Sequence, residues 1–138
     1  MEQAKFQLTN YSFNRAIFNF TDIPQSTEWE VKFSPKGSFS AATSVFDLGL
    51  LVQIRIKGQE TDNIAVLCDA QFTFNAPLTF EDIPSYFYTN SIPIIYPYIK
   101  AFIGTMGVLA NVKSMLILPT YNLSPLAEVL RKNTKEEK

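Results

Sequence analysis

The sequence predicts an α+β fold in which a four-stranded antiparallel sheet is packed by a long kinked helix and a short C-terminal helix. Across residues 5–76, apolar side chains recur at every second position, and Val, Ile, Phe and Thr are frequent, as expected for strands. After residue 76, longer apolar runs without this alternation indicate helices over about 82–134. A length of 138 residues suits one hydrophobic core, so we expect a single domain spanning 1–138.

The strongest strand signals lie at 45–57 and 64–74. In both segments apolar and polar side chains alternate, which is typical of an antiparallel strand with one face buried and one face in water. The polar connection 58–63 is short enough for a hairpin between them. The apolar faces are expected to comprise Leu50, Val52, Ile54 and Ile56 in the first segment and Ile64, Val66, Cys68, Ala70, Phe72 and Phe74 in the second.

Two weaker strands are expected at 5–20 and 28–33. The first loses its alternation near Tyr11 and Phe13, which predicts a bulge or bend there. The proline and glycine in the stretch 35–38 are expected to end the second strand, and a loop is expected to follow.

The long helix is predicted from the apolar run 90–107. Ser91 can serve as its N-cap, and Pro93 then falls in the first turn, where a missing N–H removes no hydrogen bond. Pro97 lies inside the helix and should kink it, because it removes one backbone hydrogen bond. An extended connector is expected over 108–121.

The short C-terminal helix is predicted to follow a Ser-Pro start at 124–125. Leu126, Val129 and Leu130 form an apolar stripe at helical spacing. The charged residues 132–138 are expected to be a frayed tail.

Composition and charge argue against several classes of protein. A membrane-spanning helix needs about 20 consecutive apolar residues, and the run 90–107 is interrupted by Pro93, Pro97 and Lys100. A net charge of −1 with 18% charged residues offers no basic surface for nucleic acid. The N-terminus lacks the apolar stretch of a secretory signal, so we expect a cytoplasmic protein with neither a membrane nor a nucleic-acid partner.

Residues needed for most catalytic sites are missing or scattered. The chain has no histidine, which is the commonest general base and metal ligand. Cys68 lies on an apolar strand face, where a structural thiol is expected. Asp47, Asp69, Glu81 and Asp82 share no motif and are interpreted as solvated charges. No phosphate-binding glycine pattern and too few zinc ligands are present, so we expect no enzyme, no catalytic residue, no metal and no cofactor.

Aromatic content is high for so small a domain. Aromatic residues make up 14% of the chain, with twelve Phe and six Tyr. Large exposed apolar patches usually mark places where a partner docks, because apolar surface in water favours association. We therefore interpret part of this surplus as a binding surface.

The order of elements and four short motifs resemble the SecB family of export chaperones. Residues 6–8 resemble the family's first strand, and Leu-Cys-Asp at 67–69 resembles the Leu-Cys-Glu of its fourth strand. Ile-Ile-Tyr-Pro-Tyr at 94–98 resembles the Ile-Leu-Phe-Pro-Tyr that opens its long helix. Leu-Pro-Thr-Tyr-Asn-Leu at 118–123 looks like the Leu-Ala-Pro-Val-Asn-Phe before its last helix. The similarity spans nearly the whole chain, which is thus expected to be one SecB-like domain.

The resemblance implies a Greek-key sheet and a homotetramer, a dimer of dimers, with edge strands paired across subunits and the long helices buried between dimers. It also implies an ATP-independent holdase that binds unfolded or precursor polypeptides in long apolar grooves, for protein export. The residues expected to line the groove are Trp29, Phe33, Phe39, Tyr86, Phe87, Tyr121 and Leu126. The residues expected at the oligomer interface are Ile95, Tyr98, Ile99, Phe102 and Met106, with the small residues Ala101, Gly104, Thr105 and Gly107 allowing close helix contact.

Delivery to the SecA motor is a further implication of the resemblance. In the family it uses an acidic sheet surface and a C-terminal tail, and Leu67 and Asp69 match the fourth-strand part of that surface. The first-strand acidic positions fall near Arg15 and Asn19, which are basic and neutral, and the tail has mixed charge. These departures weigh against SecA coupling and favour a divergent SecB-like protein, and some such relatives are chaperones for an antitoxin.

Two alternatives stay open at this point. One is a SecB-like chaperone dedicated to a single partner, such as an antitoxin. The other is a small-ligand-binding domain in which the curved sheet and the kinked helix enclose an apolar cavity. The sequence names no client and does not choose between general export and a toxin–antitoxin role.

Overall fold

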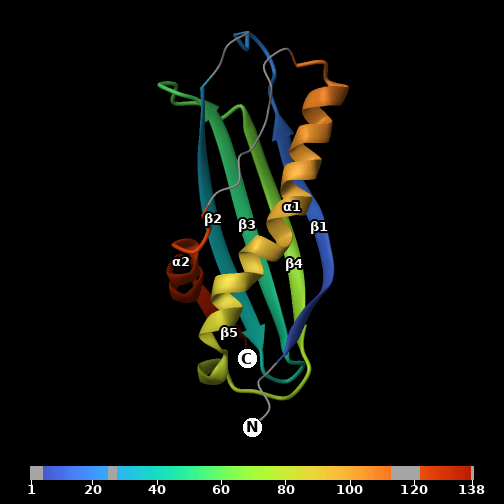
Figure 1. The fold of residues 1–138 in the computed structure, drawn as a ribbon, viewed down its shortest axis with the longest axis vertical. Coiled ribbons are helices and arrows are strands. Elements are labelled where there is room, and N and C mark those ends of the chain that lie inside the picture. The colour runs from blue at the N-terminus through green and yellow to red at the C-terminus, as the bar shows by residue number, and fades with distance from the viewer. Residues whose placement is uncertain (1–4, 25–27, 113–121, 138) are drawn as a thin grey trace.

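A five-stranded sheet is crossed on one side by a single long helix (Figure 1). The computed structural model describes residues 5–24, 28–112 and 122–137. In chain order the elements are β1 (Phe6–Phe18), β2 (Trp29–Ser40), β3 (Val45–Ile56), β4 (Ile64–Phe74), the 3₁₀ turn η1 (Phe80–Asp82), α1 (Ser85–Leu109), α2 (Leu126–Lys132) and β5 (Thr134–Glu137).

The strands lie in the order β1-β4-β3-β2-β5. The first four are antiparallel neighbours in a Greek-key order, as the resemblance implies. The prediction of four antiparallel strands is incomplete, because β5 pairs in parallel with the end of β2. The sheet is therefore mixed, and among the described residues β1 and β5 are its edges.

Alternation in β3 and β4 is confirmed almost position by position. The inner face of β4 is buried from Ile64 to Phe74, and β3 buries Leu50, Val52 and Ile54 against it. Ile56, at the end of β3, is only partly buried. The outer residues of both strands, apart from Gly49, keep contact with water, so along β3 and β4 one face of the sheet is buried and the other is solvated.

Irregularities in β1 occur where the lost alternation predicts them. The register against β4 shifts between Leu8 and Asn10 and again between Phe13 and Arg15. These shifts increase local twist and aim Phe13 toward α1, where its ring stacks on that of Phe102 with centroids 4.3 Å apart.

Strand β2 is longer than predicted, because Pro35 and Gly37 do not end it. The strand continues to Ser40 and pairs with β3 along its whole length. Pro35 lies before the β5 pairing, which starts at Gly37, so its missing N–H removes no bond from that pair. Phe39, expected in a loop, is therefore an inner-face strand residue and is fully buried.

Helix α1 begins at Ser85, six residues before the predicted N-cap Ser91. Phe87 and Tyr88 are buried in its first turn, so packing on the sheet extends the helix upstream. Ser91 is buried inside the helix, and Pro93 therefore lies in the helix interior together with Pro97. The connector predicted over 108–121 starts after Leu109, and residues 113–121 lie outside the described residues.

The tail predicted to be frayed instead forms strand β5. The backbone N–H of Gly37 donates to the carbonyl of Asn133 at 3.1 Å, and the Nδ2 of Asn133 donates to the carbonyl of Pro35 at 3.3 Å. Thr134 is buried, and its Oγ1 donates to the carbonyl of Leu130. A Cβ at Gly37 would lie 2.9 Å from Oγ1 of Thr134, so glycine permits this close approach.

An aromatic cluster around Phe87 joins α1 to the sheet. The ring of Phe87 has five aromatic neighbours, with centroids between 4.5 and 5.7 Å away, contributed by Phe6, Phe46, Phe72, Phe74 and Tyr88. Such pairs stabilise beyond the area that they bury. Phe87 is therefore the centre of the core at the start of α1.

Replacement of Phe87 by alanine should lower the free energy of unfolding by about 3–5 kcal/mol, because it removes a buried ring and leaves a cavity. Urea denaturation followed by circular dichroism measures this loss. The control is Val129→Ala, since Val129 is 41% exposed and should cost less than about 1 kcal/mol. A loss of similar size in both variants would contradict the assignment of Phe87 to the core.

Candidate functional site

Within residues 5–24, 28–112 and 122–137, helix α1 leaves part of the inner sheet face uncovered. Figure 1 shows α1 running diagonally from the C-terminal end of β2 toward β1, so the start of β2 lies away from the helix. There Trp29, Val31 and Phe33 face inward, opposite Ile56, Ile54 and Val52 of β3, yet all three are only partly buried. This end of β2 is therefore an apolar surface beside the helix.

A hollow of about 610 Å³ lies between α1 and the segment that leads into α2. Its apolar lining comes from Pro93, Tyr96 and Pro97 on α1 and from Leu123. The rings of Tyr96 and Phe33 meet edge to face at 5.8 Å, which joins the hollow to the start of β2. The hollow is lined by Pro93, Tyr96, Pro97 and Leu123, and Trp29, Val31 and Phe33 form the apolar surface next to it. We refer to the hollow and this adjoining surface together as the β2–α1 cleft.

Polar residues surround the cleft without filling it. Thr89, Asn90 and Lys100 of α1 lie along one side, and Asn122 and Ser124 lie on the other. The Lys100 ammonium lies 5.7 Å from the centroid of Tyr96, within the range of a cation–π contact. An apolar floor with a polar rim suits the binding of an extended apolar segment.

The structure separates the residues predicted to line a groove. Trp29 and Phe33 belong to the cleft, and Leu126 is partly buried at the start of α2. Phe39 and Phe87 have no exposed surface and belong to the core, so they offer nothing to a partner in this conformation. Tyr86 stacks on Phe6 near the start of α1, with centroids 6.3 Å apart.

Tyr121 lies outside the described residues.

Sequence reasoning missed Pro93, Pro97 and Leu123 as lining residues of the cleft. The sequence analysis considers only how these prolines start or bend the helix. The ring of a proline within a helix also presents an apolar surface.

The outer face of α1 forms a second apolar surface. Ile94 is 39% exposed, Tyr98 is 42% exposed and Val108 is 79% exposed. The spacing of Ile94 and Val108 places them on the side of the helix turned away from the sheet, and Tyr98 lies at the edge of that side, next to β1. Nothing lies within 4 Å of a Cβ built on Gly104, so the helix backbone is open to close approach there.

The predicted interface residues divide between this surface and the core. Ile95 and Ile99 are fully buried against the sheet. Phe102 and Met106 are partly buried, and Tyr98 stacks on Tyr11 of β1 with centroids 4.4 Å apart. Helix α1 has no continuous polar side, so its sequence does not show which face points away from the sheet. Ile94 and Val108 were therefore not predicted as interface residues.

Leu67 and Asp69 lie on the outer face of the sheet, as the alternation of β4 predicts. Leu67 is opposite Arg15 of β1 and Leu51 of β3. Asp69 accepts a hydrogen bond from Nδ2 of Asn14 at 2.7 Å. The outer face thus presents apolar, acidic and basic side chains together.

Cys68 lies in the core. Burial raises the pKa of its thiol to about 11, with a smaller contribution from the nearby Asp69 charge, so the thiol is protonated at neutral pH. Among residues 5–24, 28–112 and 122–137, no group of three or more His, Cys, Asp and Glu could hold a metal ion.

Helix α1 is long and apolar enough to cross a membrane, judged by length and composition alone. In the structure it packs on the sheet, where Ile95, Ile99 and Ile103 are fully buried. A helix in the core of a protein can meet the same criterion of length and composition. Packing on the sheet therefore explains part of the apolar character of α1.

Comparison with solved structures identifies the fold. The chain is similar to the Mycobacterium tuberculosis SecB-like chaperone Rv1957, solved in complex with a ChAD peptide from the HigA1 antitoxin Rv1956, with a TM-score of 0.64, 21% sequence identity and coverage of 84% of this chain and 90% of that chain. The fold is SecB-like. The resemblance drawn from the sequence motifs is thus confirmed at the level of the fold.

A protein of unknown function from Streptococcus agalactiae is also similar, with a TM-score of 0.49, 12% identity and coverage of 86% of this chain and 100% of that chain. No protein-family model matches the sequence, and no curated protein does. The SecB-like fold is therefore recognised through its three-dimensional arrangement.

Proposed function

We propose that this protein is a SecB-like chaperone that binds unfolded polypeptides in the β2–α1 cleft without ATP. The main support is an apolar hollow on a SecB-like fold, lined by Pro93, Tyr96, Pro97 and Leu123 and connected through the Tyr96–Phe33 ring contact to the partly buried start of β2. Further support comes from the similar Rv1957 chaperone, which was solved with a peptide of an antitoxin.

The physical basis of binding is burial of apolar surface. Covering about 300 Å² of apolar surface at about 25 cal/mol per Å² would contribute about 7.5 kcal/mol. Ordering an unfolded segment opposes much of this gain, so the net affinity should be moderate. Because apolar burial does not depend on a particular side-chain sequence, many extended apolar segments would fit the cleft.

The alternative is a chaperone dedicated to a single client protein, and the antitoxin peptide bound to Rv1957 favours this alternative. Both versions use the same cleft and differ in selectivity. A dedicated chaperone would protect one partner far better than unrelated unfolded proteins, whereas a general export chaperone would protect many.

We also propose a homotetramer, a dimer of dimers, in the cytoplasm. Two observations support an assembly. β1 is an edge strand of 13 residues, which can pair with a copy of itself across a subunit boundary. The exposed Ile94, Tyr98 and Val108 then give the outer face of α1 an apolar contact surface, and Gly104 allows a second helix to come close.

The chaperone proposal predicts that a substoichiometric to equimolar amount of the protein suppresses aggregation of a chemically denatured client without ATP. Phe33→Ser should weaken client binding about tenfold, since the loss of about 1.4 kcal/mol from one aromatic contact corresponds to that factor. Light scattering during client refolding measures the effect.

The matched control is Phe18→Ser, because Phe18 is also a partly buried strand phenylalanine but packs near Phe20 and Phe102, away from the cleft. Circular dichroism should show both variants folded. No suppression by the unaltered protein, or equal loss in the two variants, would contradict the proposal.

The tetramer predicts a solution mass of about four times the 15.6 kDa chain in light scattering coupled to size exclusion. Ile94→Glu should dissociate it, because a charge would be buried between apolar helices. Val129→Glu is the control, since Val129 on α2 is 41% exposed and Ile94 is 39% exposed. A monomer for the unaltered protein would overturn the assembly.

A further inference from the structure

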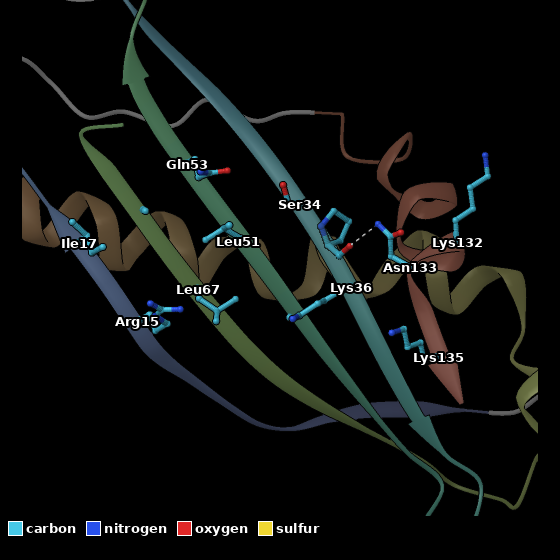
Figure 2. Close-up of a pocket in the computed structure, with 13 residues that line it drawn as sticks. Arg15, Ile17, Ser34, Lys36, Leu51, Gln53, Leu67, Lys132, Asn133 and Lys135 are labelled. Atoms are coloured by element: carbon cyan, nitrogen blue, oxygen red, sulfur yellow. Dashed lines mark hydrogen bonds between the residues drawn. The ribbon is translucent and has the colours of Figure 1, made fainter. Parts of the chain in front are cut away.

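The outer face of the sheet contains a groove that is separate from the β2–α1 cleft. It has a volume of about 720 Å³ and is lined by residues of β1, β2, β3, β4 and the C-terminal segment. Figure 2 shows these side chains on one side of the sheet with α1 behind it. Its occupant would therefore not compete for the cleft.

The floor of this groove is apolar. Leu67 of β4 and Leu51 of β3 are directly opposite each other in the strand register, and both project from the outer face (Figure 2). Ile17 and Ala65, also opposite each other, extend the apolar floor along β1 and β4. Ile17 is 62% exposed, so this floor is open to a partner.

The rim of the groove is basic on both sides. Arg15 lies opposite Leu67 on the β1 side. On the other side, Lys36 projects from β2, and its aliphatic stem lies over Gly49, with Cγ and Cε 3.7 and 3.8 Å from the position of a Cβ there. Lys132 and Lys135 complete this side.

The C-terminal segment brings two of these cations to the groove. Lys132 ends α2 and Lys135 lies in β5, which is attached to β2 through the hydrogen bonds between Asn133 and both Pro35 and Gly37. Figure 2 shows the bond from Asn133 beside Lys36 and Lys135. If the tail were frayed, the basic rim would be incomplete.

The carboxylates beside the groove are fewer than its four cations in the part of the chain that the structure describes. The ion pairs within it join Arg55 to Asp62 and Lys57 to Glu28, and none involves a lysine or arginine of the groove. No carboxylate lines the groove itself, but Asp69 lies next to Lys36, with its Oδ1 3.4 Å from the position of a Cβ on Gly49, and Asp47 and Asp69 line the adjoining hollow with Lys36 and Lys135. Arg15, Lys36, Lys132 and Lys135 still outnumber these two carboxylates, so a groove with an apolar floor and a rim of net positive charge is complementary to a segment with apolar residues between acidic ones.

We propose that this groove binds an acidic segment of a protein partner, in which two apolar side chains lie between two carboxylates. The distance from β1 to β5 is about 19 Å, or four strand spacings of about 4.8 Å each. An extended segment with Glu, Leu, Leu and Glu at every second position places all four side chains on one face and spans about 20 Å. Its carboxylates would meet Arg15 on one side and Lys36 and Lys135 on the other.

Fluorescence anisotropy with the labelled peptide Ser-Glu-Ser-Leu-Ser-Leu-Ser-Glu-Ser tests this site on the full chain. Binding is expected at low salt and should weaken at least tenfold at about 1 M salt, where the screening length falls to about 3 Å. Two control peptides, one with Lys in place of both Glu and one with Ser in place of both Leu, should bind at least tenfold more weakly.

The variant Lys36→Glu/Lys135→Glu should lower peptide affinity at least tenfold. Lys5→Glu/Lys57→Glu makes the same change in net charge at exposed lysines outside the groove, so it should leave the peptide affinity within about twofold. Loss of the exposed Lys57–Glu28 ion pair should have little effect on stability. Circular dichroism should show both variants folded.

Phe33→Ser, which alters the cleft, should also leave peptide binding unchanged, so this site is tested independently of the chaperone proposal. Equal binding of the lysine peptide, equal loss in both charge variants or loss in Phe33→Ser would overturn the proposed site. Tighter binding of vesicles of anionic lipid that the peptide does not displace would overturn the assignment of a protein partner.

Discussion

The structure depends on burial of one sheet face under one helix. The inner residues of β3 and β4 are apolar along their full length, and α1 covers them through Phe87, Ile92, Ile95, Ile99 and Ile103. A single helix is about 10 Å wide, whereas five strands extend over about 19 Å between their edges. The helix therefore cannot cover the whole face, and among the described residues its own outer side keeps exposed apolar groups such as Ile94 and Val108.

The surfaces left by this mismatch are the ones to which we assign function. The start of β2 stays partly exposed beside α1 and forms the cleft with Tyr96, Pro93 and Pro97. The outer side of α1 shows Ile94 and Tyr98, which a second copy would cover. In the proposed function, this partly exposed apolar surface binds clients and forms contacts between subunits.

The strand pattern was the most predictable part of the fold. In β3 and β4, period-two alternation identifies the buried side because local geometry alone decides which face a side chain joins. The ends of elements were less predictable. Pro35 and Gly37 signal a break locally, but pairing with β3 and β5 continues β2 through them.

Long-range contacts explain the other differences. Residues 134–137 are a charged sequence with no strand signal, and they form β5 because α2 packs beside β2. Ser91 is a good cap residue by type, but Phe87 and Tyr88 extend α1 upstream through contacts with the sheet. Among the residues predicted to line a groove, Trp29 and Phe33 are partly buried, whereas Phe39 and Phe87 have the same chemistry and are fully buried. Residue type alone does not distinguish a cleft from a core.

The position of a bound client tests the central claim most directly. A photo-reactive side chain in place of Asn90 would lie at the rim of the β2–α1 cleft, and one in place of Gln71 would lie on the outer face of the sheet. Illumination in the presence of a denatured client should give cross-links from position 90 and few from position 71. Cross-links of equal yield from both positions, or from position 71 alone, would contradict binding in the cleft.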